Sequence, residues 1–136
     1  MAIKNKKILL YHFSDKDIKG KLSPDFFGSN SYSLREKKSC NIKRIFFYLE
    51  KLNYEPRLVS NKYLYIVKIG KSQLYDFRED KLNLKEKFNN IYDILEYIKI
   101  FYKGIIYDLG RYSVANLFED IDVYKKKVLK RYDNKK

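Results

Sequence analysis

The stretch KEKFNNIYDILEYIKIFYKGIIY, residues 85–107, decides the fold class of this chain. Its apolar residues recur at every third or fourth position, which is the spacing of one face of an α-helix; they are Phe88, Ile91, Tyr92, Leu95, Ile98, Phe101 and Tyr102. Gly104 stands where a glycine commonly ends a helix, and the Ile-Ile-Tyr run after it favours a strand. The stretch therefore predicts one long helix over residues 85–102 and a short strand over residues 105–107.

Short runs of β-forming residues predict the other main elements. Residues 8–13 (ILLYHF) form an apolar run that ends at a Ser-Asp turn signal, which indicates a first, central strand. The segment 16–38 is punctuated by Gly, Pro, Ser and Asn and predicts a long loop. Further strands are expected at residues 43–49, 62–70, 73–77 and 113–118, and a short C-terminal helix at 124–132. The expected fold class is α+β, with a bent or split, mostly antiparallel sheet.

Length and composition predict one soluble domain. The chain has 136 residues, of which 45% are hydrophobic and 35% charged, and this fits a single core over residues 1–132 with a charged tail at 133–136. No apolar run reaches the roughly 20 residues that cross a bilayer, and the first residues lack the apolar stretch of a secretory signal. We expect a cytoplasmic protein without membrane contact. The single cysteine, Cys40, and the single histidine, His12, exclude an intrachain disulfide and a zinc cage of Cys and His ligands.

The strong positive charge predicts phosphate-rich or acidic partners. Thirty Lys and Arg residues stand against 17 Asp and Glu residues, which gives a formal net charge of +13. Such a field raises the local concentration of nucleic acids, nucleotides and acidic protein surfaces. A solvated basic surface without any ligand is the alternative interpretation, because charge bears on solubility and association rather than on fold.

The first candidate site is the group Tyr11, His12, Phe13 and Ser14, at the end of the first expected strand. A neutral imidazole donates a hydrogen bond from one nitrogen and accepts one at the other, which suits holding a sugar hydroxyl as well as acid–base chemistry. The alternative is a structural histidine that bonds to the backbone.

The second candidate site is the loop FFGSNSYS, residues 26–33. Its small residues would let a ligand approach the backbone, and its aromatic residues would stack on a flat ring. It contains neither a Walker-type phosphate loop nor a G-x-G-x-x-G motif. The loop could cradle a nucleotide, and the alternative is a surface turn whose aromatic side chains cover the core.

The third candidate site consists of two acids that follow late strands. Asp108 comes directly after the Gly-Ile-Ile-Tyr run, and Glu119 follows the strand expected at 113–118. A carboxylate there could bind a ribose hydroxyl and stabilise positive charge that develops at a sugar carbon. Alternatively, both are ordinary turn acids, and Glu119 belongs to an acidic surface turn with Asp120 and Asp122.

Taken in chain order, these segments resemble small ADP-ribosyltransferase-like domains, including those of some phage and bacterial effectors. The resemblance is carried by LYHFS at 10–14, the loop from Phe27 to Tyr32, KGIIY at 103–107, and a following strand that ends in an acid. It implies an NAD-dependent mono-ADP-ribosyltransferase that modifies a protein or nucleic-acid target. The small size and the composition also fit an effector of a phage or mobile element.

In the branch of that family with a His, Tyr and Glu-type triad, the resemblance implies a role for each matching residue. His12 would hold the nicotinamide ribose, and Tyr32 and Phe27 would pack against the nicotinamide. Either Glu119 or Asp108 would stabilise an oxocarbenium-like transition state. The remaining NAD contacts implied in this way are Tyr11, Ser14, Gly28, Ser29 and Ser31.

Two other functions remain open on the sequence. The first is a non-catalytic accessory protein that binds nucleic acid or protein, with Lys and Arg on phosphates and aromatic residues on bases. The second is a metal-independent ribonuclease in which His12 and a Lys or Tyr share the proton transfers. The positive charge fits all of these functions and does not choose among them.

Overall fold

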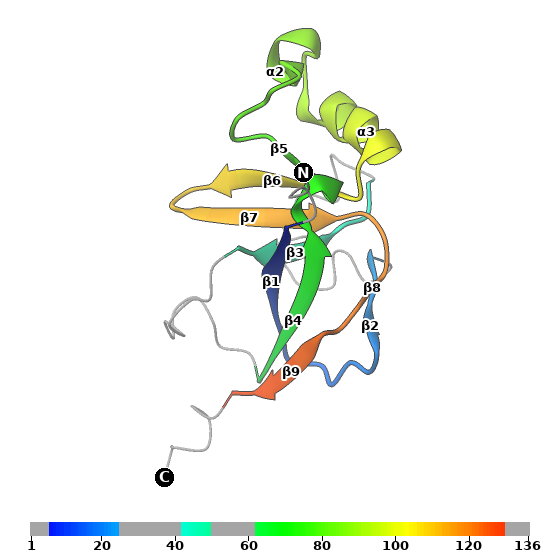
Figure 1. Ribbon diagram of the computed structural model, residues 1–136, viewed down its shortest axis with the longest axis vertical. Helices are drawn as coiled ribbons and strands as arrows, with labels where there is room; N and C mark the ends of the chain where they lie inside the picture. Colours follow the sequence, from blue (N-terminus) through cyan, green and yellow to red (C-terminus); the bar gives the residue numbers. More distant parts are fainter. Residues whose placement is uncertain (1–5, 25–41, 50–61, 130–136) are drawn as a thin grey trace.

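A seven-stranded sheet forms the body of the protein in the computed structural model, which describes residues 6–24, 42–49 and 62–129. Its strand order is β5-β6-β7-β3-β1-β4-β9 (Figure 1). The strands are β1 (Lys7–Ser14), β3 (Ile45–Tyr48), β4 (Tyr63–Gly70), β5 (Leu74–Asp76), β6 (Gly104–Leu109), β7 (Tyr112–Leu117) and β9 (Lys125–Val128). Strands β2 (Lys21–Leu22) and β8 (Ile121–Asp122) form a small second sheet. The helical elements are η2 (Lys71–Gln73), α2 (Leu84–Lys87) and α3 (Ile91–Phe101).

The sheet is mixed and mostly antiparallel. Among the described strands, only β5 and β6 pair in parallel, and the other pairs are antiparallel. Strand β1 pairs with β3 on one side and with β4 on the other, and its ladder with β4 runs from Lys7 opposite Gly70 to Ser14 opposite Tyr63. This confirms the interior position expected for the first strand. Strands β6 and β7 cross the direction of β1 and β4, so the sheet is strongly twisted (Figure 1).

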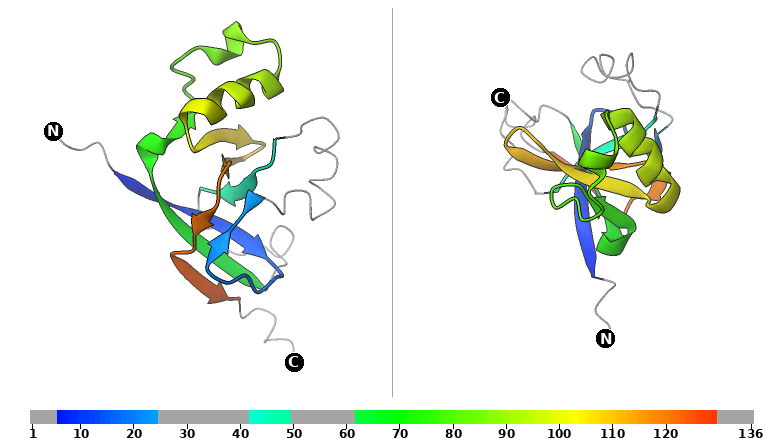
Figure 2. Two further views of the ribbon diagram at one scale, coloured as in Figure 1. Left: turned by 90° about the vertical axis from the view of Figure 1, so that its right-hand side faces the viewer. Right: turned by 90° about the horizontal axis from the view of Figure 1, so that it is seen from above.

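The two faces of the sheet bury different clusters of side chains. One face carries Leu10, Phe47, Tyr65 and Val67, and the small β2-β8 sheet packs on it through Leu22. On the other face, α3 lies over the β5-β6 end of the sheet (Figure 2). There α3 contributes Ile94, Leu95 and Ile98 to a second core.

The long helix expected over residues 85–102 is wrong, because the structure divides this stretch into α2 and α3. Phe88, which follows α2, has an extended backbone with φ −125° and ψ 146°. Asn90 caps α3, since its side chain accepts a hydrogen bond from the backbone N–H of Asp93 at 3.0 Å. Asparagine is favoured at such caps over helix interiors, so the two adjacent asparagines interrupt the apolar pattern.

The short C-terminal helix expected at 124–132 is also wrong within the described residues. Residues 125–128 form β9, which pairs antiparallel with β4 from Ile66 opposite Lys125 to Tyr63 opposite Val128. The backbone groups of β4 gain partners through this pairing, and that outweighs the helix tendency of a lysine-rich run. Lysines are common on edge strands, where they discourage further pairing.

The other expected strands are confirmed with shifts of a few residues at their ends. They correspond to β1, β3, β4, β5, β6 and β7. The expected long loop contains β2 at its start, and its part from residue 25 onward lies outside the described residues, as does the charged tail.

Candidate functional site

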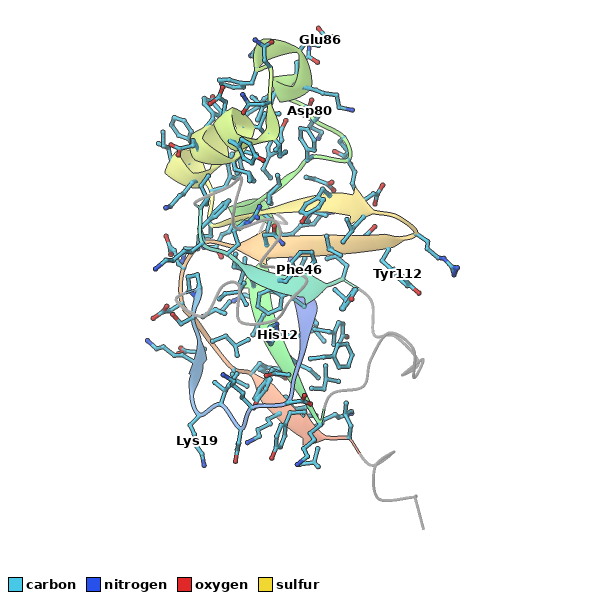
Figure 3. The ribbon with its side chains drawn as sticks, turned by 180° about the vertical axis from the view of Figure 1, so that it is seen from behind. His12, Lys19, Phe46, Asp80, Glu86 and Tyr112 are labelled. Atoms are coloured by element: carbon cyan, nitrogen blue, oxygen red, sulfur yellow. The ribbon has the colours of Figure 1, made fainter. Side chains whose placement is uncertain are left out.

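His12 lies on the face of β1 that carries the first core. Its ring packs near the rings of Phe47 and Tyr65, with centroid distances of 5.6 Å and 6.4 Å. The Nδ1 atom lies 2.7 Å from the carbonyl oxygen of Phe46 on β3 (Figure 3). A carbonyl oxygen only accepts hydrogen bonds, so Nδ1 carries the proton and donates it.

The surroundings of His12 keep its imidazole neutral. Burial lowers the pKa of His12 from its ordinary value of 6.5, and this outweighs the opposite effect of the bond to Phe46. With Nδ1 protonated in a neutral ring, Nε2 is left as an acceptor. No hydrogen bond to Nε2 is found within residues 6–24, 42–49 and 62–129. The side chain is half-buried, so it combines a fixed tautomer with an available acceptor.

The sequence neighbours of His12 do not share its surroundings. Tyr11 packs with the cluster on the opposite face of the sheet, because successive strand residues point to opposite sides. Ser14 accepts a hydrogen bond from the backbone N–H of Lys16 at 3.0 Å, which closes the turn after β1. The structure therefore brings Tyr11 and His12 to different faces, although both are expected to contact NAD.

Asp108 lies near the hairpin end of β6 and is exposed. Its carboxylate accepts a hydrogen bond from the hydroxyl of Ser113 at 2.8 Å. The same hydroxyl accepts a bond from Nη1 of Arg78 at 3.2 Å. The charge of Asp108 is therefore partly compensated by a hydroxyl and a nearby guanidinium.

Glu119 lies two residues beyond the other end of the β6-β7 hairpin and is exposed. No hydrogen bond or ion pair of its side chain is found among the described residues. It borders a hollow of about 250 Å³ that Lys68 and Lys103 also line. Within the described residues, the carboxylate of Glu119 thus makes no hydrogen bond or ion pair, in contrast to that of Asp108.

The pairing of the strands places His12 far from both candidate acids. Tyr11 on β1 lies opposite Tyr48 on β3, so His12 lies opposite Phe47. Phe47 in turn pairs with a residue of β7 that pairs with Ile106 on β6, so His12 and Ile106 lie in one row across the sheet. With about 4.8 Å between strands and about 3.3 Å per residue, each acid lies roughly 16 Å from His12 along the sheet. The two acids lie at opposite ends of their hairpin, so one sugar cannot contact both. The loop candidates, which are Phe27, Gly28, Ser29, Ser31 and Tyr32, lie outside the described residues.

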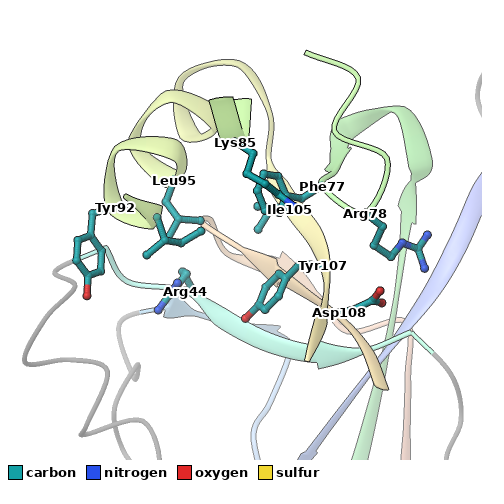
Figure 4. A pocket seen from close by; sticks show the side chains of 10 residues that line it. Arg44, Phe77, Arg78, Lys85, Tyr92, Leu95, Ile105, Tyr107 and Asp108 are labelled. Carbon is teal, nitrogen blue, oxygen red and sulfur yellow. The ribbon is translucent and has the colours of Figure 1, made fainter. Parts of the chain in front are cut away.

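Sequence reasoning missed a pocket of about 470 Å³ between α3 and the sheet. Of the candidate residues, Asp108 lines it, whereas His12 and Glu119 do not. Its cationic residues are Arg44, Arg78 and Lys85 (Figure 4). Arg78 and Lys85 lie seven residues apart, but Arg44 comes from a distant part of the chain, so no local motif unites all three.

Neither metal ligands nor a membrane span is found in the described part of the chain. No group of three or more His, Cys, Asp or Glu side chains there could hold a metal ion. None of the described helices is long and apolar enough to cross a membrane. No protein-family model, no curated protein and no solved structure matches this chain.

Proposed function

We propose that this protein is an NAD-dependent mono-ADP-ribosyltransferase in which His12 holds the nicotinamide ribose. The supporting observation is the fixed neutral tautomer of His12, with Nδ1 donating to the Phe46 carbonyl. The acceptor Nε2 is the atom that a ribose hydroxyl would bond to. The resemblance of the LYHFS and KGIIY segments to ADP-ribosyltransferase-like domains supports the same function.

The proposed reaction requires little acid–base chemistry from the histidine. The bond between the ribose carbon and the nicotinamide nitrogen breaks, and nicotinamide leaves with the electron pair. A nucleophile of the target then supplies a pair to the same carbon. Positive charge develops on the ribose during this step, so a nearby carboxylate lowers the barrier by electrostatic stabilisation. A neutral, fixed imidazole suits the reaction because it adds no further positive charge.

Glu119 is the better candidate for that carboxylate. Its side chain has no hydrogen-bond or ion-pair partner among the described residues, whereas Asp108 accepts a hydrogen bond from Ser113, which in turn accepts one from Arg78. An unpaired carboxylate offers more of its negative charge to a sugar cation than a paired one does. A ribose between the extended side chains of His12 and Glu119 would bridge their separation. The basic surface of the protein would attract an acidic protein or a nucleic acid as the target.

The test uses NAD⁺ binding by calorimetry together with nicotinamide release. His12→Asn is the decisive variant, because its amide can still donate to the Phe46 carbonyl but lacks an acceptor at the position of Nε2. We expect His12→Asn to melt close to the wild-type temperature and to lose nicotinamide release by a factor of about 100 or more. His12→Ala removes both bonds and should lose release and some stability.

The acid is tested in the same assay. Glu119→Gln should reduce nicotinamide release by about 100-fold or more, whereas the matched Asp108→Asn variant should stay within a few-fold of wild type. Wild type that neither binds NAD⁺ at millimolar concentration nor releases nicotinamide contradicts the proposal. Binding to nucleic acid that weakens in moderate salt, without nicotinamide release, would then favour a non-catalytic accessory protein.

A further inference from the structure

The pocket between α3 and the sheet is separate from the surroundings of His12. It opens on the face covered by α3, whereas His12 packs against Phe47 and Tyr65 on the opposite face. A ligand in this pocket would therefore not touch His12.

Positive charge dominates the lining of the pocket. The lining holds three cationic side chains, Arg44, Arg78 and Lys85, and one carboxylate, Asp108, while Asp76 pairs with Arg78 beside it. Arg44 is buried, with 8% of its surface exposed. A guanidinium at a buried wall is well suited to bind planar, anionic groups, because its donors form a rigid fork. The charge pattern favours an anionic ligand.

Arg78 is held in a fixed position before any ligand arrives. Its Nε and Nη2 atoms donate to the two carboxylate oxygens of Asp76 at 2.8 Å and 2.7 Å, and its Nη1 atom donates to Ser113. Binding groups that are already oriented lose less entropy when they meet a ligand. Lys85, on α2, lies at the same end of the pocket, with its ammonium 5.7 Å from the centre of the Phe77 ring. Three of the five N–H donors of Arg78 are used in these bonds, so a phosphate at this end would bind the remaining two and the Lys85 ammonium.

Aromatic side chains line the other end of the pocket. Tyr92 of α3, Tyr107 of β6 and Arg44 surround this space, and Arg78 lies on the far side of Tyr107 (Figure 4). Flat rings and a guanidinium stack favourably on a nucleobase. The volume of about 470 Å³ lies in the usual range for small-molecule sites, which is about 300–1,000 Å³.

A buried amide lies directly behind this wall. Asn116 is fully buried, and its register places it opposite Ile105, which lines the pocket. Its Oδ1 accepts a hydrogen bond from the hydroxyl of Tyr107 at 3.1 Å, whereas its Nδ2 has no partner. Rotating the amide would only exchange the unpaired atom. A buried polar group without a partner is rare in proteins and is commonly completed by a water molecule or a ligand.

We propose that this pocket binds a nucleotide whose base presents hydrogen-bond acceptors, as guanine does, and whose phosphate lies between Arg78 and Lys85. Arg44 donates to the acceptor edge of the base, in the geometry by which arginine reads the O6 and N7 atoms of guanine in nucleic acids. The nucleotide is either free or the 5′-phosphorylated end of a single strand. This site goes beyond the proposed transferase and does not depend on it.

The experiment uses the full chain with Tyr92→Trp, because the protein has no tryptophan and the new indole reports on the pocket alone. Fluorescence is titrated with GMP, AMP, guanosine, inorganic phosphate and a short single-stranded oligonucleotide with a 5′-phosphorylated guanosine. We expect GMP to bind about tenfold or more tightly than AMP, guanosine or phosphate. If the oligonucleotide binds more tightly than GMP, the natural source is a strand end; if it binds more weakly, the source is the free nucleotide.

Charge reversal tests the pocket against the basic surface as a whole. Lys85→Glu should weaken GMP binding by about tenfold or more, since it places a negative charge beside the phosphate. Lys87→Glu is the matched control, because Lys87 is an exposed lysine of the same helix that does not line the pocket. His12→Asn should leave GMP binding unchanged, which separates this site from the transferase proposal. Equal weakening by both lysine variants, equal binding of phosphate and GMP, or no response to any ligand would overturn the proposal.

Discussion

Polar side chains at the two ends of the main sheet bond to different kinds of partners. At the end formed by β1, β3 and β4, which we call the His12 end, the partners are backbone atoms. His12 donates to the Phe46 carbonyl, and the hydroxyl of Tyr65 bonds to the backbone of Lys16 and Ile18. At the end formed by β5, β6 and α3, which we call the α3 end, the partners are charged side chains. Arg78 pairs with Asp76, and the Tyr75 hydroxyl donates to Asp80.

This difference predicts different chemistry at the two ends. Backbone partners hold a neutral group without adding charge, so the His12 end suits contact with an uncharged sugar. The α3 end instead gathers the cationic side chains of Arg44, Arg78 and Lys85 around one pocket, so it suits an anionic ligand. Substitutions at matched positions can test how far the contrast extends.

The largest effect is expected at Gly104 of the α3 end, where β6 lies between β5 and β7. A Cβ atom there would lie 2.4 Å from the carbonyl oxygen of Asn116 and 2.6 Å from a methyl group of Leu117. We expect Gly104→Ala to lower the free energy of unfolding by about 3 kcal/mol, because backbone atoms must shift to relieve the contact. Urea denaturation followed by circular dichroism measures this change.

Gly70, at the end of β4, provides the matched control. The nearest atom to a Cβ there is Oε1 of Gln73, at 3.7 Å, which is an ordinary contact. Gly70→Ala should change the free energy of unfolding by less than about 1 kcal/mol. Similar losses in both variants would show that the α3 end is no more tightly packed around its glycine than the His12 end.

Removing one tyrosine hydroxyl from each end compares charged with backbone partners directly. The Tyr75 hydroxyl donates to Asp80 and accepts from the backbone N–H of Leu82 at 3.0 Å. Tyr75→Phe should cost about 2 kcal/mol, because it removes a hydrogen bond to a charged group. Tyr65→Phe should cost about 1 kcal/mol, since water can reach the exposed backbone near Lys16 instead. Thermal melts of both variants compare the stability that each one loses. If Tyr65→Phe loses as much stability as Tyr75→Phe, or more, the difference between backbone and charged partners is contradicted.

The ionisation of Tyr75 gives an independent measurement on the same pair. Burial, followed by the bond to the Asp80 carboxylate, raises the pKa of Tyr75 to about 12. Ultraviolet titration of the folded protein should therefore show tyrosine ionisation near this pH, and Tyr75→Phe should reduce its amplitude by one tyrosine. An unchanged amplitude in the variant would show that the hydroxyl is not held by Asp80 in solution.

The smallest effect is a difference in how stability depends on pH. The pKa of His12 is lowered by burial in the folded state, so the unfolded state binds its proton first as the pH falls. Stability is then unaffected by this group above pH 6.5 and declines below it, with a slope of at most about 1.4 kcal/mol per pH unit. His12→Asn should flatten the decline between about pH 6 and pH 5, as measured by urea denaturation.

The α3 end should respond in a lower pH range. The bond from Arg78 lowers the pKa of Asp76 below its ordinary value of 3.8. The stability that this carboxylate contributes is therefore present above pH 3.8 and is lost as the pH falls through the lowered pKa. Asp76→Asn should change the pH dependence only below about pH 4. A change in the same range as for His12→Asn would contradict the assignment of the two groups.

The strands were predictable because their residues carry a local signal. Residues 63–70 form β4. They are rich in β-branched and aromatic residues, and their side chains point alternately to the two faces of the sheet. The apolar spacing after Ile91 likewise marks α3. The break between α2 and α3 was missed because the apolar pattern continues through Phe88, while the Asn90 side chain caps a new helix. Strand β9 was missed because its lysine-rich sequence becomes a strand only beside β4.

The candidate site was predictable in part. The position of His12 at the end of an apolar strand drew attention to it, and the structure adds the Phe46 carbonyl that fixes its tautomer. The lining of the α3 pocket could not be predicted, because Arg44, Tyr92 and Tyr107 are far apart in the chain and each has an unremarkable sequence context. They line one pocket only because the fold places the start of β3, β6 and α3 next to one another.

By itself, the sequence determined the fold class, most of the strands and the large excess of positive charge, because side-chain periodicity and composition are properties of the chain alone. The tertiary structure decided which nitrogen of His12 carries a proton, which acid accepts a hydrogen bond from Ser113 and where the cations gather. The physical reason is that hydrogen bonds and electrostatic interactions act over a few ångströms in space. Their partners here, such as His12 and Phe46 or Arg78 and Ser113, lie 34 and 35 residues apart in the sequence.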